Sequence, residues 1–418
     1  MFCVPSCFSQ PAVLPDDVAP VVEEGAAPLA VGAGDGGEGR EWYQVRVDEN
    51  LSLQASGHCK GGDPKLSPPG LALATVTVAT GEGGKPVARA RMGCGGIRQC
   101  GKAGNKCETK DLWHLGSDGK AMTSMLCAIF VDKGIVSWDT TVGECEDVVT
   151  GQTNEQYLNV TLKQLLTHTA GFMSACSGPV WNLAYEQHAS SAEPREQRVT
   201  CLSALLKTPP QVEPGTQHIY SNWGYAMAGH MLEYKMNASY ESLVGKYLFN
   251  GLGITTFGFG SAPGVTNPWG HGEYSKWKPI SPEELGSDNP TALNPAGRIH
   301  MSIGDWCRFI AASLSPALAN ELLGVTNATM RALRTPPVSQ EYAPGAWLVV
   351  SRGWAKGNVL THGGSNTLNH CVAWLAPDGL TNPNTPIGAA AFGAVVCCNS
   401  GAGLPVLDLA VGELIRAT

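Results

Sequence analysis

Hydrophobic residues alternate with polar or small ones in two segments near the beginning of the chain. Residues 71–80 have the sequence LALATVTVAT, and residues 86–92 have the sequence PVARARM after a Gly-Glu-Gly-Gly turn. Period-two alternation is typical of a half-buried strand, and two such segments joined by a glycine-rich turn predict a β-hairpin. The pattern returns near the end of the chain, where we expect strands in residues 346–354, 368–376 and 387–398.

Between these two parts the hydrophobic period changes to three and four residues. From Ser117 onward, Met122, Leu126 and Ile129 share one helical face, and Gly134 follows as a plausible helix stop. The interval 258–297 is rich in proline and glycine and predicts an extended loop. The same reasoning predicts helices in residues 161–167, 200–207, 222–236, 239–249 and 302–314, and a last helix in residues 404–416.

The order strands, helices, strands, helix predicts a mixed α/β (α+β) fold. An antiparallel sheet built from both chain ends would be flanked by helices, with a mainly helical region inserted at about residues 130–335. Residues 1–39 are rich in proline, glycine and alanine, and they carry six acidic residues and no lysine or arginine. We expect them to form a disordered extension to one domain spanning residues 40–418.

Composition and charge exclude several classes of protein. The 418 residues are 43% hydrophobic and 15% charged, which fits a globular enzyme with a sizeable core. The net charge is −8, most of it in residues 1–39, so the rest is nearly neutral and offers no basic surface for nucleic acid. No apolar run reaches the length of a membrane-spanning helix. The oligomeric state cannot be derived from these features.

The spacing of the cysteines and histidines predicts no bound metal ion, and no other cofactor is expected. The spacing of Cys94, Cys100 and Cys107 matches no zinc motif, and the ten histidines form no HExxH sequence, which argues against a metal-dependent hydrolase. The fourteen cysteines are compatible either with a disulfide in an oxidising compartment or with buried thiols. The N-terminus lacks the positive region of a signal peptide, whereas four Asn-X-Ser/Thr sequons would suit a secreted or organellar protein. The compartment is left open.

The first candidate for chemistry is Ser117-Asp118-Gly119-Lys120. A serine needs a base to become a nucleophile, and residues i and i+3 share a helix face, so the Lys120 amine can reach the Ser117 hydroxyl. Lysine must be neutral for this role, and burial favours the neutral form. On its own the pattern is weak, because Ser117 could simply cap the helix and because Ser275 and Lys278 repeat the spacing in a loop.

Longer segments carry a resemblance to a known family. Residues 112–123 resemble the nucleophile segment of β-lactamase-related serine hydrolases, the group of class C β-lactamases, penicillin-binding proteins and DD-peptidases. Residues 132–139 and 161–171 (TLKQLLTHTAG) resemble the turn and the hallmark segment that follow. The resemblance extends over roughly residues 70–415 and implies the β-lactamase/transpeptidase-like fold.

The resemblance also implies roles for two further motifs. Tyr220-Ser221-Asn222 matches the family's Tyr-X-Asn, although Tyr157 and Asn159 repeat that spacing. Tyr220 would then move protons, and Asn222 would hold the substrate amide and orient Lys120. The third motif, Lys-Thr-Gly in the family, is here replaced by His362-Gly363-Gly364. Its histidine and glycines would line the substrate, and the backbone N–H groups of Ser117 and Ser365 would form the oxyanion hole.

These assignments predict a serine hydrolase that forms an acyl-enzyme with a small-molecule or peptide substrate. We expect ester, amide or D-amino-acid peptide bonds to be cleaved, as in an esterase or DD-peptidase. β-Lactams are less favoured, because the lysine and threonine that help engage their carboxylate are replaced. The alternative is a catalytically inactive relative that serves as a scaffold or self-assembling protein.

Overall fold

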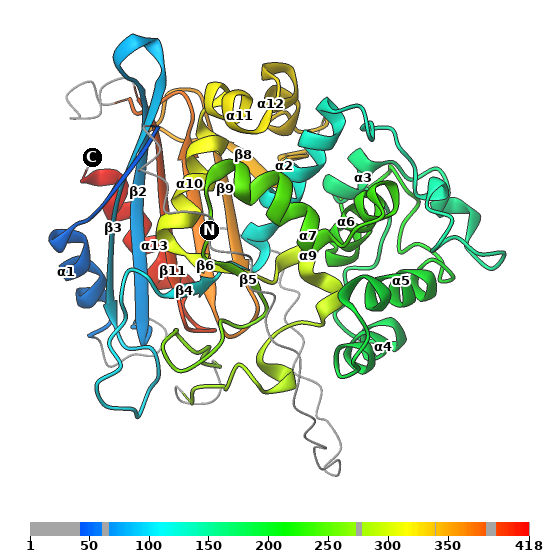
Figure 1. The fold of residues 1–418 in the computed structure, drawn as a ribbon, viewed down its shortest axis with the longest axis horizontal. Helices are drawn as coiled ribbons and strands as arrows, with labels where there is room; N and C mark the ends of the chain where they lie inside the picture. Colours follow the sequence, from blue (N-terminus) through cyan, green and yellow to red (C-terminus); the bar gives the residue numbers. More distant parts are fainter. Residues whose placement is uncertain (1–41, 61–66, 273–277, 339, 382–389, 418) are drawn as a thin grey trace.

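The computed structural model describes residues 42–60, 67–272, 278–338, 340–381 and 390–417. Within these ranges the main sheet has eight strands in the order β1-β3-β2-β11-β10-β9-β8-β7 (Figure 1). The strands are β1 (Tyr43–Val47), β2 (Gly70–Thr80), β3 (Pro86–Gly96), β7 (Tyr342–Ala343), β8 (Trp347–Ser351), β9 (Asn358–Ser365), β10 (His370–Ala376) and β11 (Ala391–Cys398). The predicted extension at residues 1–39 lies outside the described residues.

The two ends of the chain meet in the middle of this sheet. β2 and β3 form the predicted antiparallel hairpin, and β2 also pairs antiparallel with β11 near the C-terminus. The expected sheet built from both chain ends is therefore confirmed. β1, which the sequence did not predict, adds to the edge by pairing parallel with β3. β9 pairs antiparallel with β10 and carries His362 to Ser365; the hydrophobic pattern did not predict this strand, although the family resemblance placed the third motif on one.

Helices cover both faces of the sheet (Figure 1). The alternation along β2 divides its side chains between two cores, with Leu71 and Leu73 on one side and Ala72 and Ala74 on the other. The first core includes residues of α1 (Glu49–His58) and α13 (Leu404–Arg416). The second core is larger and joins the sheet to α10 (Ile303–Leu314) and to the helical region.

The helical region agrees with the sequence analysis in part. Its helices are α2 (Gly119–Asp132), α3 (Leu162–Leu166), α4 (Pro179–His188), α5 (Pro194–Leu205), α6 (Asn222–Met236), α7 (Tyr240–Val244), α8 (Asn250–Leu252), α9 (Asn294–Gly297), α11 (Pro316–Leu323) and α12 (Asn327–Leu333). The prediction for α6 is confirmed at both ends, and α7 continues as a π-helix to Phe249. α5 begins earlier than predicted because Glu193 and Glu196 form a capping box around Pro194.

A small second sheet was missed, in part because it uses residues predicted to be loop. β4 (Leu112–His114), β6 (Ile299–Ser302) and β5 (Phe257–Phe259) pair antiparallel in the order β4-β6-β5. The prediction of a loop over residues 258–297 is therefore wrong at both ends of this range. Its first residues belong to β5, and its last residues form α9. Strands of three or four residues carry too little alternation to be recognised.

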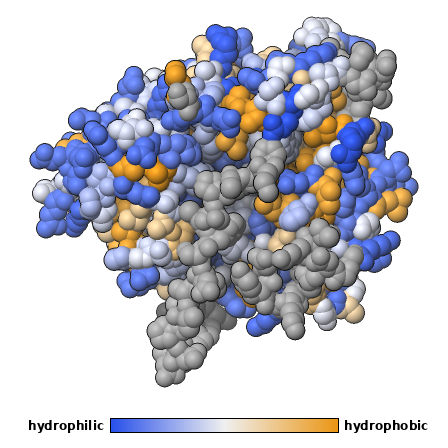
Figure 2. All heavy atoms as spheres, turned by 180° about the vertical axis from the view of Figure 1, so that it is seen from behind, coloured by the Kyte–Doolittle hydropathy of each residue, from blue (hydrophilic) through white to orange (hydrophobic). Residues whose placement is uncertain are grey.

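Cysteines and surface features complete the description. The cysteines of the core, such as Cys127, Cys201 and Cys307, are thiols. No helix among the described residues is long and apolar enough to span a membrane. Seen from behind, the described surface is mainly hydrophilic, with apolar residues in separate small groups (Figure 2).

Candidate active site

Ser117 lies in a tight turn between β4 and α2. The turn is the 3-10 segment Gly116–Asp118, and Gly116 has a φ of +48°, which favours glycine. Asp118, not Ser117, occupies the position before the first residue of α2, so Ser117 does not cap the helix. Its side chain is half-buried at the N-terminal end of α2, where the helix dipole favours negative charge.

The amine of Lys120 lies one helical turn further on, within reach of Ser117. Lys120 Nζ is 3.0 Å from Ser117 Oγ, and its side chain is fully buried. The same nitrogen donates to Asn222 Oδ1 at 2.7 Å and to the backbone oxygen of Ala296 at 2.5 Å. A neutral amine has two N–H groups and one lone pair. These two oxygens and the Ser117 hydroxyl lie around the amine, so the Ser117 hydroxyl is within reach of the lone pair of a neutral Lys120.

Tyr220 and Asn222 are brought to Lys120 at the start of α6. The centre of the Tyr220 ring lies 4.9 Å from Lys120 Nζ, and Asn222 is the first residue of the helix. The segment between them is anchored, since Ser221 Oγ donates to the backbone oxygen of Met173 at 2.6 Å. Three of the predicted side chains, those of Ser117, Tyr220 and Asn222, therefore converge on Lys120.

The repeated motifs found in the sequence have other surroundings. The ring of Tyr157 is buried against Phe172, with the ring centroids 4.9 Å apart. Ser275, the serine of the second SxxK sequence, lies outside the described residues.

His168, from the hallmark segment, brackets Tyr220 on both sides. Its backbone oxygen accepts the N–H of Ile219 at 2.7 Å, and its ring Nδ1 accepts the N–H of Ser221 at 3.1 Å. The ring is fully buried and lies 4.3 Å from the ring of Tyr220. Burial is the main reason that the pKa of His168 lies well below its usual value, and a positive charge on Lys120 lowers it further, so this histidine is neutral. The sequence analysis gave it no role.

Gly364 and Ser365 lie at the end of β9, directly against the nucleophile turn. A side chain at Gly116 would reach within 2.3 Å of the backbone nitrogen of Ser365. A side chain at Gly364 would approach Leu115 O to 2.0 Å and Asp118 N to 3.0 Å. Both glycines are therefore required by the close approach of two backbone segments. This contact brings the residue before Ser117 to Ser365.

His362 has a more interior position than the sequence suggested. Its side chain is 6% exposed, and both ring nitrogens have partners in the protein. Nδ1 lies 3.2 Å from Asp118 Oδ1, and Nε2 lies 3.1 Å from the hydroxyl of Tyr342. Asp118 also accepts from Cys371 Sγ at 2.9 Å. His362 thus connects β9 to the residue that follows the nucleophile, a link the sequence did not reveal because its partners are distant along the chain.

Comparison with known proteins places this geometry in a family. The family model named Beta-lactamase matches residues 67–405. A curated relative, the Unguisins hydrolase ungD of Aspergillus violaceofuscus (strain CBS 115571), is 26% identical over 222 residues. That match covers 50% of this chain and 38% of the relative, so the chain spans well under half of the length of this protein.

Solved structures share the fold at low sequence identity. A class C β-lactamase has a TM-score of 0.61 at 18% identity, covering 84% of this chain and 91% of that one. A D-alanine carboxypeptidase from Burkholderia cenocepacia has a TM-score of 0.59 at 18% identity, covering 84% and 94%. A D-stereospecific amidohydrolase from Streptomyces sp. has a TM-score of 0.60 at 19% identity, covering 88% and 98%. With a family match over most of its length and the corresponding fold, the chain belongs to the Beta-lactamase family.

Proposed function

We propose that this protein is a serine hydrolase that works through an acyl-enzyme on Ser117. The observation that carries the proposal is the placement of Lys120 Nζ, which is buried, lies 3.0 Å from Ser117 Oγ and is also hydrogen-bonded to two carbonyl oxygens. Such an amine is held in the orientation in which its lone pair can take the proton of the serine hydroxyl. Membership of a family of hydrolases supports the same reaction class.

The reaction follows from these positions. Ser117 Oγ attacks the substrate carbonyl as its proton passes to Lys120, and Tyr220, beside the same amine, conducts a proton to the leaving group. The negative charge that develops on the carbonyl oxygen is stabilised by the backbone N–H groups of Ser117 and Ser365. The leaving group departs, and water then attacks the acyl-enzyme and regenerates Ser117. Asn222 orients Lys120 and forms a hydrogen bond with the substrate amide.

The third motif supports a substrate class. His362 cannot offer a free cation to a substrate carboxylate, because its ring is buried and its nitrogens are engaged by Asp118 and Tyr342. Gly363 and Gly364 leave the edge of β9 without side chains, so an extended substrate can lie against its backbone. Ester, amide or D-amino-acid peptide bonds are therefore favoured over β-lactams.

The test is the mass of the intact protein after incubation with a fluorophosphonate and, separately, with a penicillin. The wild type is expected to gain the mass of one fluorophosphonate adduct, and Ser117→Ala is expected to fold normally and gain none. A lasting penicillin adduct would favour the penicillin-binding branch of the family. If neither reagent modifies the wild type, the scaffold alternative replaces this proposal.

A further inference from the structure

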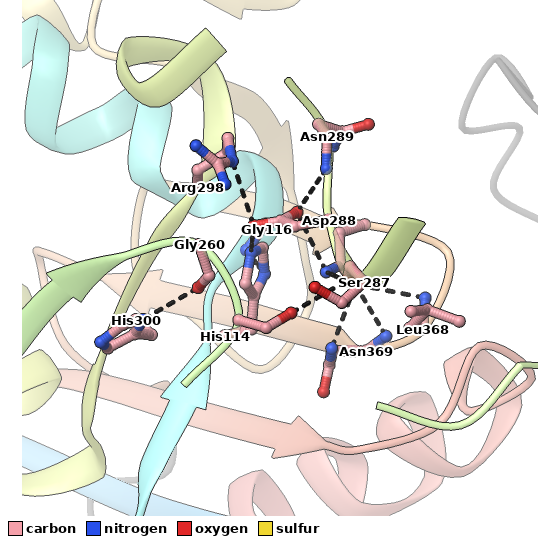
Figure 3. A network of polar contacts seen from close by, with 12 residues as sticks. His114, Gly116, Gly260, Ser287, Asp288, Asn289, Arg298, His300, Leu368 and Asn369 are labelled. Carbon is pink, nitrogen blue, oxygen red and sulfur yellow. Dashed lines mark hydrogen bonds and ion pairs between the residues drawn. The ribbon is translucent and has the colours of Figure 1, made fainter. Parts of the chain in front are cut away.

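A buried carboxylate, Asp288, lies between the two segments that would form the oxyanion hole (Figure 3). Its side chain is 1% exposed. Asp288 Oδ2 is 2.8 Å from His114 Nε2, and Oδ1 is 3.1 Å from Asn366 Nδ2. His114 precedes the nucleophile turn, and Asn366 follows Ser365 directly. The Asp288 side chain thus contacts both the segment that leads to the nucleophile turn and the segment that follows Ser365.

The His114 contact determines which ring nitrogen carries the proton. His114 Nδ1 is 3.0 Å from the backbone nitrogen of Gly116. A backbone N–H can only donate, so Nδ1 must be the unprotonated acceptor, and Nε2 must carry the hydrogen that it donates to Asp288. Asp288 therefore fixes the tautomer and orientation of His114, and through it the N–H of the residue immediately before Ser117.

The contact between Asp288 and Asn366 fixes the second segment, at the end of β9. Asn366 Oδ1 accepts the N–H groups of Leu368 at 3.2 Å and Asn369 at 2.9 Å, and the side-chain amide of Asn369 at 3.1 Å. With its oxygen occupied by the turn, Asn366 presents its amide nitrogen to Asp288 and, at 3.4 Å, to the backbone oxygen of Ser287. This fixes the end of β9 where Ser365 lies.

Arg298 completes the cluster and keeps Asp288 ionised. Arg298 Nε is 3.3 Å from Asp288 Oδ2, and its Nη1 donates to Asn294 Oδ1 at 2.7 Å and to Thr291 Oγ1 at 3.1 Å. Burial alone would raise the pKa of Asp288, but the neighbouring His114 and Arg298 hold it well below its usual range. The carboxylate is therefore a fixed hydrogen-bond acceptor for both His114 and Asn366.

We propose that Asp288 is a positioning residue that sets the backbone N–H groups of Ser117 and Ser365 relative to each other. The inference rests on the proposed acyl-enzyme function, in which those two groups stabilise the oxyanion. Oxyanion donors work only when they are already aimed at the developing charge, so a shift of either segment lowers the rate without weakening substrate binding. The two segments touch at Gly116 and Ser365, and Asp288 contacts each of them at a second point, through His114 and Asn366.

The test uses Asp288→Asn in the full-length protein, with 4-nitrophenyl acetate as substrate and phenylboronic acid as a probe of the oxyanion hole. The substitution keeps the size of the side chain and removes its charge and one of its acceptors. We expect kcat to fall about 10–100-fold with KM little changed, because a small misplacement of a catalytic group by a distant substitution can cost about 100-fold in rate. The boronic acid forms a tetrahedral anion on the serine, so its affinity should fall by a similar factor.

Glu233→Gln is the matched control. Glu233 is also a buried carboxylate that joins an arginine and a histidine, Arg198 and His230, but it lies near the C-terminal end of α6. Both substitutions are expected to lower the melting temperature, and only Asp288→Asn should lower kcat and boronic acid affinity. Asn366→Asp keeps an oxygen for the N–H groups of Leu368 and Asn369 and removes the N–H donor to Asp288, so it provides the same comparison if Asp288→Asn does not fold.

The possible failures are distinguishable. A folded Asp288→Asn protein with the kcat and boronic acid affinity of Glu233→Gln would overturn the positioning role while leaving the proposed function intact. A wild type that takes up neither fluorophosphonate nor boronic acid would remove the proposed function, and this inference with it.

Discussion

At the scale of single residues, Lys120 organises the candidate site. Three oxygen atoms surround its amine, from Ser117, Asn222 and Ala296, and they come from three separate parts of the chain. The sequence predicted the contact with Ser117 from helical spacing and the contact with Asn222 from the family resemblance, and the third is a backbone oxygen that no motif encodes. His168 and Asp288 were not assigned for the same reason, because their effect depends on which distant N–H group each one reaches.

Tyr220→Phe tests the proton-transfer role at this scale. The ring packs against His168, so the variant should keep its fold, while loss of the hydroxyl should slow acylation by about 10²–10⁴-fold, the usual contribution of a positioned acid or base. The rate of fluorophosphonate labelling measures this. Tyr157→Phe, in the second Tyr-X-Asn sequence, is the control, and equal labelling rates in the two variants would refute the role of Tyr220.

At the scale of elements, the close contact between β9 and the nucleophile turn determines the shape of the site. The sequence predicted long periodic elements such as α6 and α13 well, because many residues contribute to each pattern. The hydrophobic pattern missed β9 because the glycines at its end break the alternation, and it missed β4 because three residues show no period. The glycines that obscured the strand are the residues that permit the contact.

Gly364→Ala tests this contact. The new methyl group would meet Leu115 O at 2.0 Å, so β9 and the turn must separate, and we expect labelling of Ser117 to slow by about 10²-fold or more as an oxyanion donor is displaced. Gly363→Ala is the matched substitution one residue earlier, where the nearest atom is Cys371 O at 3.7 Å, an ordinary contact. Its labelling rate should fall much less. Similar losses in two folded variants would argue against the steric explanation.

At the scale of the whole molecule, buried histidines link stability to pH. His271 is fully buried, with Nδ1 donating to Asn399 O at 2.8 Å and Nε2 accepting from Cys100 N at 3.2 Å. Burial lowers its pKa to about 4, and that of His300 to about 4 as well. These histidines stay neutral in the folded protein at pH values where the unfolded chain is protonated.

The sign of the effect follows from linkage. Between about pH 6.5 and 4 the unfolded chain binds more protons than the folded one, so the free energy of unfolding should decrease as the pH falls through this window. The melting temperature, measured by calorimetry, should drop accordingly. His271→Gln removes one contributor and should show a shallower dependence over the same window, despite a lower stability at pH 7. A slope equal to that of the wild type would contradict the assignment.

The junction of β2 with β11 also has a consequence for the order of events during synthesis. The N–H of Gly70, at the start of β2, donates to Asn399 Oδ1 across 329 residues of sequence, and the strand pairing beside it has similar spans. Contacts between such distant residues form slowly, because a long loop must close first. A nascent chain emerging from the ribosome therefore has β2 and Ser117 long before β9 and β11 exist. Labelling of Ser117 should appear only after the last strands are made, and until then the apolar side chains of β2 lack their partner strand β11.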